Sequence, residues 1–212
     1  MRNLLLILLF FISISQTYAQ YASVELSSGG FSFVPAFTDI ESNFIINAGT
    51  GTKGLLSAHM IGNIRSVSMN PRSFIFITRA KLFDQKFKMT AGIHLPAMQI
   101  DQDTFEVDSF FAQELIASYP ISEKVTLSAM YIHGKGRNND LEINLLTMNA
   151  NVVHGRFSFL SQVYLLDLDN TYGAAESITY KLFDKWDLRG FANYTASIQD
   201  FKWMVGIRRH LQ

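Results

Sequence analysis

The sequence has 212 residues, 18 basic and 18 acidic side chains, no cysteine, and 48% hydrophobic residues. This charge balance excludes the strongly basic field that nucleic-acid binding needs, and the lack of cysteine excludes disulfides and a lipid-modified cysteine anchor. The apolar fraction, with 18 phenylalanines, predicts extensive contact with a non-aqueous partner.

The first 19 residues have the pattern of a secretory signal peptide. Arg2 gives a basic start, Leu4 to Ile14 is apolar apart from Ser13, and Thr17 and Ala19 are small residues before the expected cleavage point. The apolar run is shorter than the roughly 20 residues of a spanning helix. We expect residues 1–19 to be removed and residues 20–212 to form one domain beyond the inner membrane.

Residues 20–50 show the weakest periodicity, because Gly29-Gly30 and Pro35 interrupt any continuous strand. Counting back from the clearer carboxyl-terminal part, strands at 31–37, 43–49 and 55–65 would give a barrel of twelve strands. The alternative is ten strands, with residues 20–50 forming a periplasmic extension or an inward plug.

From residue 74 onward, apolar and polar side chains alternate with a period of two, which predicts β-strands with one apolar face. Residues 74–83 and 86–95 follow this scheme and are separated by a hairpin turn at Asp84-Gln85. Further strands are predicted at 124–134, 141–153, 156–167, 174–183, 186–196 and 201–210. In 141–153 the adjacent Leu145 and Leu146 predict a β-bulge, and residues 107–119 permit either phase.

The connections between these strands alternate in length, which is typical of outer-membrane barrels with short periplasmic turns and longer outer loops. Short turns fall at 84–85, 122–123, 154–155 and 184–185, and longer links at 66–73, 96–106, 135–140, 168–173 and 197–200. The pattern predicts an all-β fold, an antiparallel up-and-down transmembrane β-barrel of about 12 strands. Both termini are expected in the periplasm.

Periodicity alone does not say which face of the sheet is wet. A soluble periplasmic barrel with an apolar interior and a hydrophobic ligand is therefore an alternative. Small residues on the apolar face, such as Ala80, Ala91, Ala129 and Ala192, would fill a large interior poorly. We therefore expect the apolar face to contact lipid.

Basic residues gather near the predicted periplasmic ends of the strands. Those expected to point inward form a candidate lumen basic cluster that would favour anions at the inner mouth: Arg79, Lys81, Lys86, Lys88, Lys181, Arg189 and Arg208. The alternative is a solvated rim that keeps charge away from lipid.

No catalytic, cofactor or metal motif is found. The five histidines have no ligand spacing, and none lies in a recognisable nucleophile motif. The acidic stretch Asp101-Gln102-Asp103 lacks the spacing of a calcium loop. The stretch His133 to Arg137 predicts a strand that runs into a basic outer loop, which would contact lipopolysaccharide phosphate. It is not predicted to be a catalytic site, because a base without a nucleophile is incomplete.

The signal peptide, the phased strands and the alternation of turns and loops resemble those of small, porin-like outer-membrane β-barrel proteins of Gram-negative bacteria. The end Arg208 to Gln212 departs from that pattern, in which the last strand closes on an aromatic residue. The resemblance implies an outer-membrane location, contact with outer-membrane lipid and a non-enzymatic narrow pore for a small solute. The alternative is a structural barrel whose outer loops bind a partner.

Overall fold

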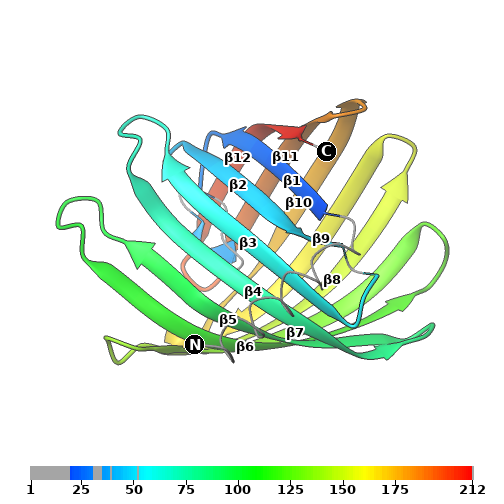
Figure 1. Cartoon of the computed structure of the whole chain (residues 1–212), viewed down its shortest axis with the longest axis horizontal. Coiled ribbons are helices and arrows are strands. Elements are labelled where there is room, and N and C mark those ends of the chain that lie inside the picture. Colours follow the sequence, from blue (N-terminus) through cyan, green and yellow to red (C-terminus); the bar gives the residue numbers. More distant parts are fainter. Residues whose placement is uncertain (1–19, 31–34, 39, 52, 212) are drawn as a thin grey trace, which may run out of the picture.

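The computed structural model describes residues 20–30, 35–38, 40–51 and 53–211. Twelve antiparallel strands form a closed barrel in which β1 pairs with β12 and every other strand pairs with its neighbours in sequence. Figure 1 shows these strands side by side and steeply inclined. Closure pairs the edge strands and leaves no open sheet edge. No helix in the described ranges is long and apolar enough to cross a bilayer.

The strands are mostly 10 to 14 residues long, the length that a tilted strand needs to cross a bilayer. Their bounds are β1 Gln20–Ser27, β2 Asn43–Thr50, β3 Leu56–Arg65, β4 Pro71–Asp84, β5 Lys88–Ile100, β6 Val107–Pro120, β7 Val125–Gly136, β8 Glu142–His154, β9 Phe157–Leu166, β10 Thr171–Phe183, β11 Trp186–Thr195 and β12 Asp200–His210.

The twelve-strand prediction is confirmed and the ten-strand alternative is wrong, but the first strand lies elsewhere than expected. The chain forms β1 at Gln20–Ser27, whereas Pro35–Phe37 is a short 3-10 helix, η1. Residues 31–34 of the expected strand, and the predicted signal peptide, lie outside the described residues. Proline lacks the N–H that a central strand donates, which accounts for the break at Pro35.

The two faces of the wall differ sharply in polarity. On β8, Met148 is 64% exposed on the outer face, whereas Thr147 is 1% exposed on the inner face. The other strands repeat this contrast, with Leu115 outside and Glu114 inside on β6, for example. The apolar residues therefore face lipid, and the alternative of a soluble barrel with an apolar interior is wrong.

The strand register shows which residues of 107–119 face inward and whether a β-bulge occurs at Leu145 and Leu146. Residues 107–119 place Glu114 inside. The bulge predicted at Leu145 and Leu146 is wrong, because both residues pair in unbroken register with β9. Leu145 instead points inward and is fully buried, and Leu146 points outward at 48% exposure.

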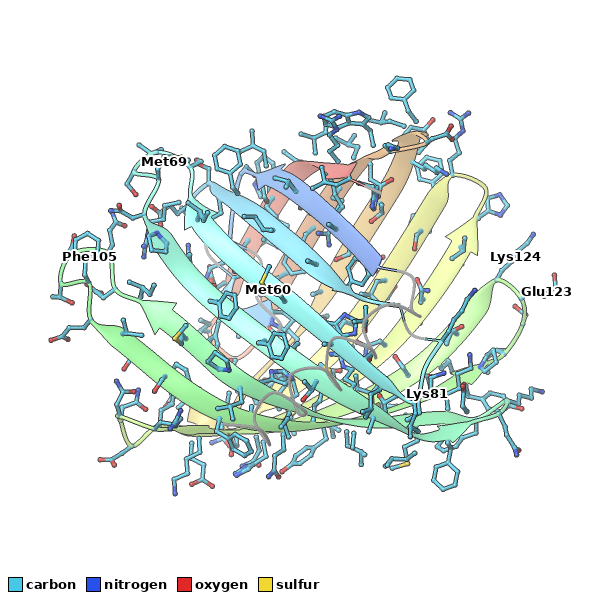
Figure 2. All side chains as sticks on the ribbon, in the orientation of Figure 1. Met60, Met69, Lys81, Phe105, Glu123 and Lys124 are labelled. Atoms are coloured by element: carbon cyan, nitrogen blue, oxygen red, sulfur yellow. The ribbon has the colours of Figure 1, made fainter. Side chains whose placement is uncertain are left out.

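The two ends of the barrel carry different connections. The links after odd-numbered strands, such as 66–70 and 101–106, are generally longer than those after even-numbered strands, such as 85–87 and 155–156. Figure 2 shows Met69 and Phe105 at one end and Lys81, Glu123 and Lys124 at the other. By the short-turn rule, the second end is periplasmic.

The outer face can be tested with a matched pair of substitutions at the centre of β8. We expect Met148→Lys to destabilise the barrel by about 2–4 kcal/mol, because it places a cation in the middle of the lipid-facing band. Asn149→Lys, one residue later on the inner face, should cost much less. Urea unfolding in lipid vesicles measures both, and equal costs would contradict the assignment of faces.

Candidate functional site: the inner wall of the barrel

The interior is organised by glycines that lie between longer side chains of the two flanking strands. Arg79 of β4, Gly92 of β5 and Glu114 of β6 are directly paired in register. A Cβ atom on Gly92 would lie 2.5 Å from Glu114 Oε1 and 3.0 Å from Arg79 Cγ. The missing side chain at Gly92 therefore allows Arg79 and Glu114 to meet above it.

The ion pair over Gly92 is buried and includes a histidine. Arg79 Nε donates to Glu114 Oε1, Arg79 Nη2 lies 3.1 Å from Oε2, and His94 Nε2 lies 2.9 Å from the same oxygen. The Glu114 side chain is 1% exposed and that of Arg79 is 20% exposed. The carboxylate thus neutralises Arg79 where it faces the interior.

A second ion cluster spans the seam where the barrel closes. Glu25 Oε2 of β1 accepts from Arg189 Nη1 of β11 at 2.7 Å and from Arg208 of β12 at 3.0 Å. Glu25 reaches Arg189 over Gly206, where an added Cβ would lie 2.7 Å from Glu25 Oε1. One buried carboxylate therefore holds two guanidinium groups.

Two neutral contacts use the same arrangement. Tyr21 and His59 meet over Gly49, with Tyr21 Oη 2.5 Å from His59 Nδ1. Over Gly173, Tyr164 and Thr195 are joined by a 2.9 Å hydrogen bond. In all four cases long polar side chains bond along the wall to residues two strands away, instead of extending toward the barrel axis.

The inner wall also carries an apolar patch, formed by β6 to β9 and covered by η1. The patch consists of Ala112, Ile132, Leu145, Tyr164 and Leu166, and Ala36 of η1 packs against it. Pro35 and Thr38 are buried. Residues 35–38 of the β1–β2 connection therefore lie inside the barrel, and the patch explains why an apolar residue faces inward at Leu145.

An ion pair fixes the other side of this connection. Glu41 Oε2 accepts from Arg65 Nε at 3.3 Å and lies 3.5 Å from Arg72 Nη1. Arg65 also donates to the backbone carbonyls of Pro71 and Ile100. The inward segment is thus fixed by apolar packing at Ala36 and by Arg65 at Glu41.

The seven predicted basic residues comprise three arginines in ion pairs and four lysines near the periplasmic end of the barrel. Arg79, Arg189 and Arg208 point inward and are paired with Glu114 or Glu25. Lys88 and Lys181 are register partners of Ser118 and Asp187, near the periplasmic end.

The other two lysines are near the same end. Lys81 Nζ lies 2.5 Å from Asp84 Oδ2, and Lys86 Nζ lies 4.9 Å from the ring centroid of Tyr119 on the outer face. Only Arg189 and Arg208 share a partner, so the proposal of a single cluster that selects anions stays a prediction.

The outer-rim histidine found in the sequence faces away from the interior. His133 Nδ1 lies 3.0 Å from Asn144 Oδ1, which also accepts from Tyr131 Oη at 2.6 Å. Asp167 accepts from both the backbone N–H and the side-chain amide of Asn144, and these two bonds lower the pKa of Asp167. In the described part of the chain, the hydrogen bonds of His133 lead to Asn144 and not to a serine.

The acidic outer loop is organised around its own backbone. Asp101 Oδ1 accepts from the backbone N–H groups of Thr104 and Asp103 and from the Thr104 hydroxyl. These bonds lower the pKa of Asp101. Within residues 20–30, 35–38, 40–51 and 53–211, no group of three potential metal-ligating side chains is found.

Sequence reasoning missed the carboxylates that pair with the arginines. Glu25 and Glu114 lie in the two segments with the least legible phase. Glycines such as Gly92, on the polar face of a predicted strand, were the available signal, since glycine in a strand marks a close approach of neighbouring groups.

A closed barrel with an apolar outer face, a polar inner face and an inward-turned loop defines the class as porin-like outer-membrane β-barrels. No family model and no curated protein matches the chain. Among solved structures, the chain is similar to the KdgM porin in complex with disordered oligogalacturonate, with a TM-score of 0.64 and 9% identity over 90% of this chain and 98% of that one. The NanC porin gives a TM-score of 0.59 and 9% identity over 89% and 97% of the two chains.

Proposed function

We propose that the protein is a non-enzymatic, narrow outer-membrane pore for small solutes. The observation that carries this proposal is the bonding of long inner side chains along the wall over Gly49, Gly92, Gly173 and Gly206. Side chains held in this way leave the region around the barrel axis to water and solute. The inward segment at η1 narrows the passage on one side.

The periplasmic mouth of this pore is basic. Lysines and arginines outnumber carboxylates in and beside the short turns, and the basic residues there include Lys86, Lys88, Lys124, Arg156 and Lys185. The KdgM structure contains oligogalacturonate, which supports a solute-conducting role for this fold. The mouth would act on the entry and exit of charged solutes at short range.

A barrel that binds a partner through its outer loops is the second candidate. The observation that favours it is the internally bonded loop at Asp101, which presents a defined acidic surface. Lys135 and Arg137, above His133 at the outer rim, are the residues that would contact lipopolysaccharide phosphate.

Conductance in planar bilayers tests the pore. Refolded protein should run as a heat-modifiable band on gels and should produce discrete, reproducible current steps. A heat-modifiable barrel that stays electrically silent and does not admit small sugars into vesicles would overturn the pore and favour the partner-binding role.

A further inference from the structure

Four adjacent strands form an inner surface almost without charge. Strands β7, β8, β9 and β10 lie side by side (Figure 1), and no inward position of β7, β8 or β9 carries an Asp, Glu, Lys or Arg. On β10 the only inward charge is Lys181, near its periplasmic end. Apart from Lys181, this part of the wall has no fixed charge with which to attract or repel an ion.

A row of neutral polar side chains runs across this surface. The strand register aligns one residue from each strand between β6 and β11, and five of the six are amides or hydroxyls: Ser118, Ser128, Asn149, Gln162, Ala175 and Asn193. We call these six residues the neutral track.

The neutral track crosses the length of the barrel. Ser118 is two residues from the periplasmic end of β6, and Asn193 is two residues from the outer end of β11. A register row climbs in this way because the strands of a barrel are tilted against its axis. Ala175 interrupts the row, and Ala175 and Asn193 are buried at its outer end. The hydrogen-bonding groups that a solute can reach are therefore those of Ser118, Ser128, Asn149 and Gln162.

The side chains of the track can both donate and accept. Asn149 Nδ2 lies 3.1 Å from Thr147 Oγ1 and 3.4 Å from Ser128 Oγ. Asn193 Nδ2 donates to Thr195 Oγ1 at 3.1 Å, while Asn193 Oδ1 is buried without a hydrogen-bond partner among the described residues. Amide and hydroxyl groups match the hydroxyls of a polyol, which also donate and accept.

The charged groups of the opposite wall are largely neutralised by each other. Glu114 forms an ion pair with Arg79, and Glu25 forms ion pairs with Arg189 and Arg208. Asp187 is hydrogen-bonded to His210, whose Nε2 lies 2.7 Å from the carboxylate. Mutual pairing at this depth weakens the field that a passing ion would meet.

We propose that the solute of this pore is an uncharged, polyhydroxylated molecule of the sugar class, which passes along the neutral track. This inference rests on the proposed pore function. The apolar body of Met130, which is partly exposed beside the track on β7, provides contact for the C–H face of a sugar ring. Hydroxyl groups exchange partners along the row while the ring slides.

Single-channel recording with two probes of equal length tests the assignment. Maltohexaose is neutral and hexagalacturonate is acidic, and we expect maltohexaose to interrupt the current for longer. Asn149→Leu together with Gln162→Leu removes two hydrogen-bonding groups from the track, so the interruptions should shorten about tenfold. The matched control, Asn47→Leu on the inner face of β2, should leave them unchanged.

The outcomes separate the inference from the pore itself. Two results in a conducting barrel overturn the neutral-solute assignment and leave the pore intact. One is that hexagalacturonate blocks the wild-type channel for longer than maltohexaose does. The other is that maltohexaose blocks the double variant for as long as it blocks the wild type. A silent barrel overturns the pore. Calorimetric titration of maltohexaose into detergent-refolded protein then decides the track separately, since absence of binding overturns it without any need for conductance.

Discussion

Glu114→Ala is expected to destabilise the barrel by about 3 kcal/mol, because it leaves the largely buried Arg79 without its carboxylate. Glu114 accepts hydrogen bonds from both Arg79 and His94 and is almost fully buried. Removing one partner of such a pair costs much more than the pair contributes, since the remaining charge is left desolvated. Urea unfolding followed by tryptophan fluorescence measures the loss.

The same substitution should change ion selectivity. An unpaired Arg79 adds positive charge to the interior, so the reversal potential in a salt gradient should shift toward anions. Glu176→Ala is the matched control, because Glu176 lies on the outer face opposite Ser161 and Ala192 and its loss should neither destabilise the barrel nor move the reversal potential. If the two variants behaved alike, the role assigned to the pair over Gly92 would be wrong.

Deletion of residues 35–38 should raise the single-channel conductance severalfold. Ala36 of this segment packs on the apolar patch, and Pro35 and Thr38 are buried inside the barrel. Because the segment is held inside the wall, removing it widens the passage that ions share. Planar-bilayer recording gives the step size, and the heat-modifiable gel shift reports whether the shortened chain still closes.

A point variant separates widening from misfolding. Glu41→Ala releases the connection from Arg65 and Arg72 and leaves its length unchanged. We expect a smaller rise in conductance and noisier open-channel current, since the segment is still seated at Ala36. Unchanged conductance in a properly closed deletion variant would show that η1 does not narrow the pore.

The wall was predictable from sequence and the interior contacts were not. The period-two pattern at 74–95 identifies two strands and their faces without tertiary information, because side chains of a strand alternate between its two sides. It worked least well where the interior itself is apolar. Leu145 belongs to the inner apolar patch that packs against η1. Two adjacent leucines, one facing inward and one facing outward, therefore led to the wrong prediction of a β-bulge.

The ion pairs depend on partners far apart in the chain. Glu25 and Arg189 are separated by 164 residues, and their contact follows from the closure of the ring and the register at Gly206. Neither the closure of the barrel nor the register between strands can be predicted from the sequence of one strand. The first strand was misplaced for a related reason, since Gln20–Ser27 is defined by pairing with both β2 and β12 more than by its own short pattern.

The seam between β1 and β12 has a kinetic consequence. Its ladder holds five aligned residue pairs among the described residues, from Ser23 with His210 to Ser27 with Gly206. Joining segments from the two ends of the chain carries the largest loop-closure entropy of any contact in this topology, and pairings so distant in sequence form slowly. The barrel is therefore expected to form its hairpins first and to pair β1 with β12 last. The ion pairs of Glu25 with Arg189 and Arg208 would form at that final step.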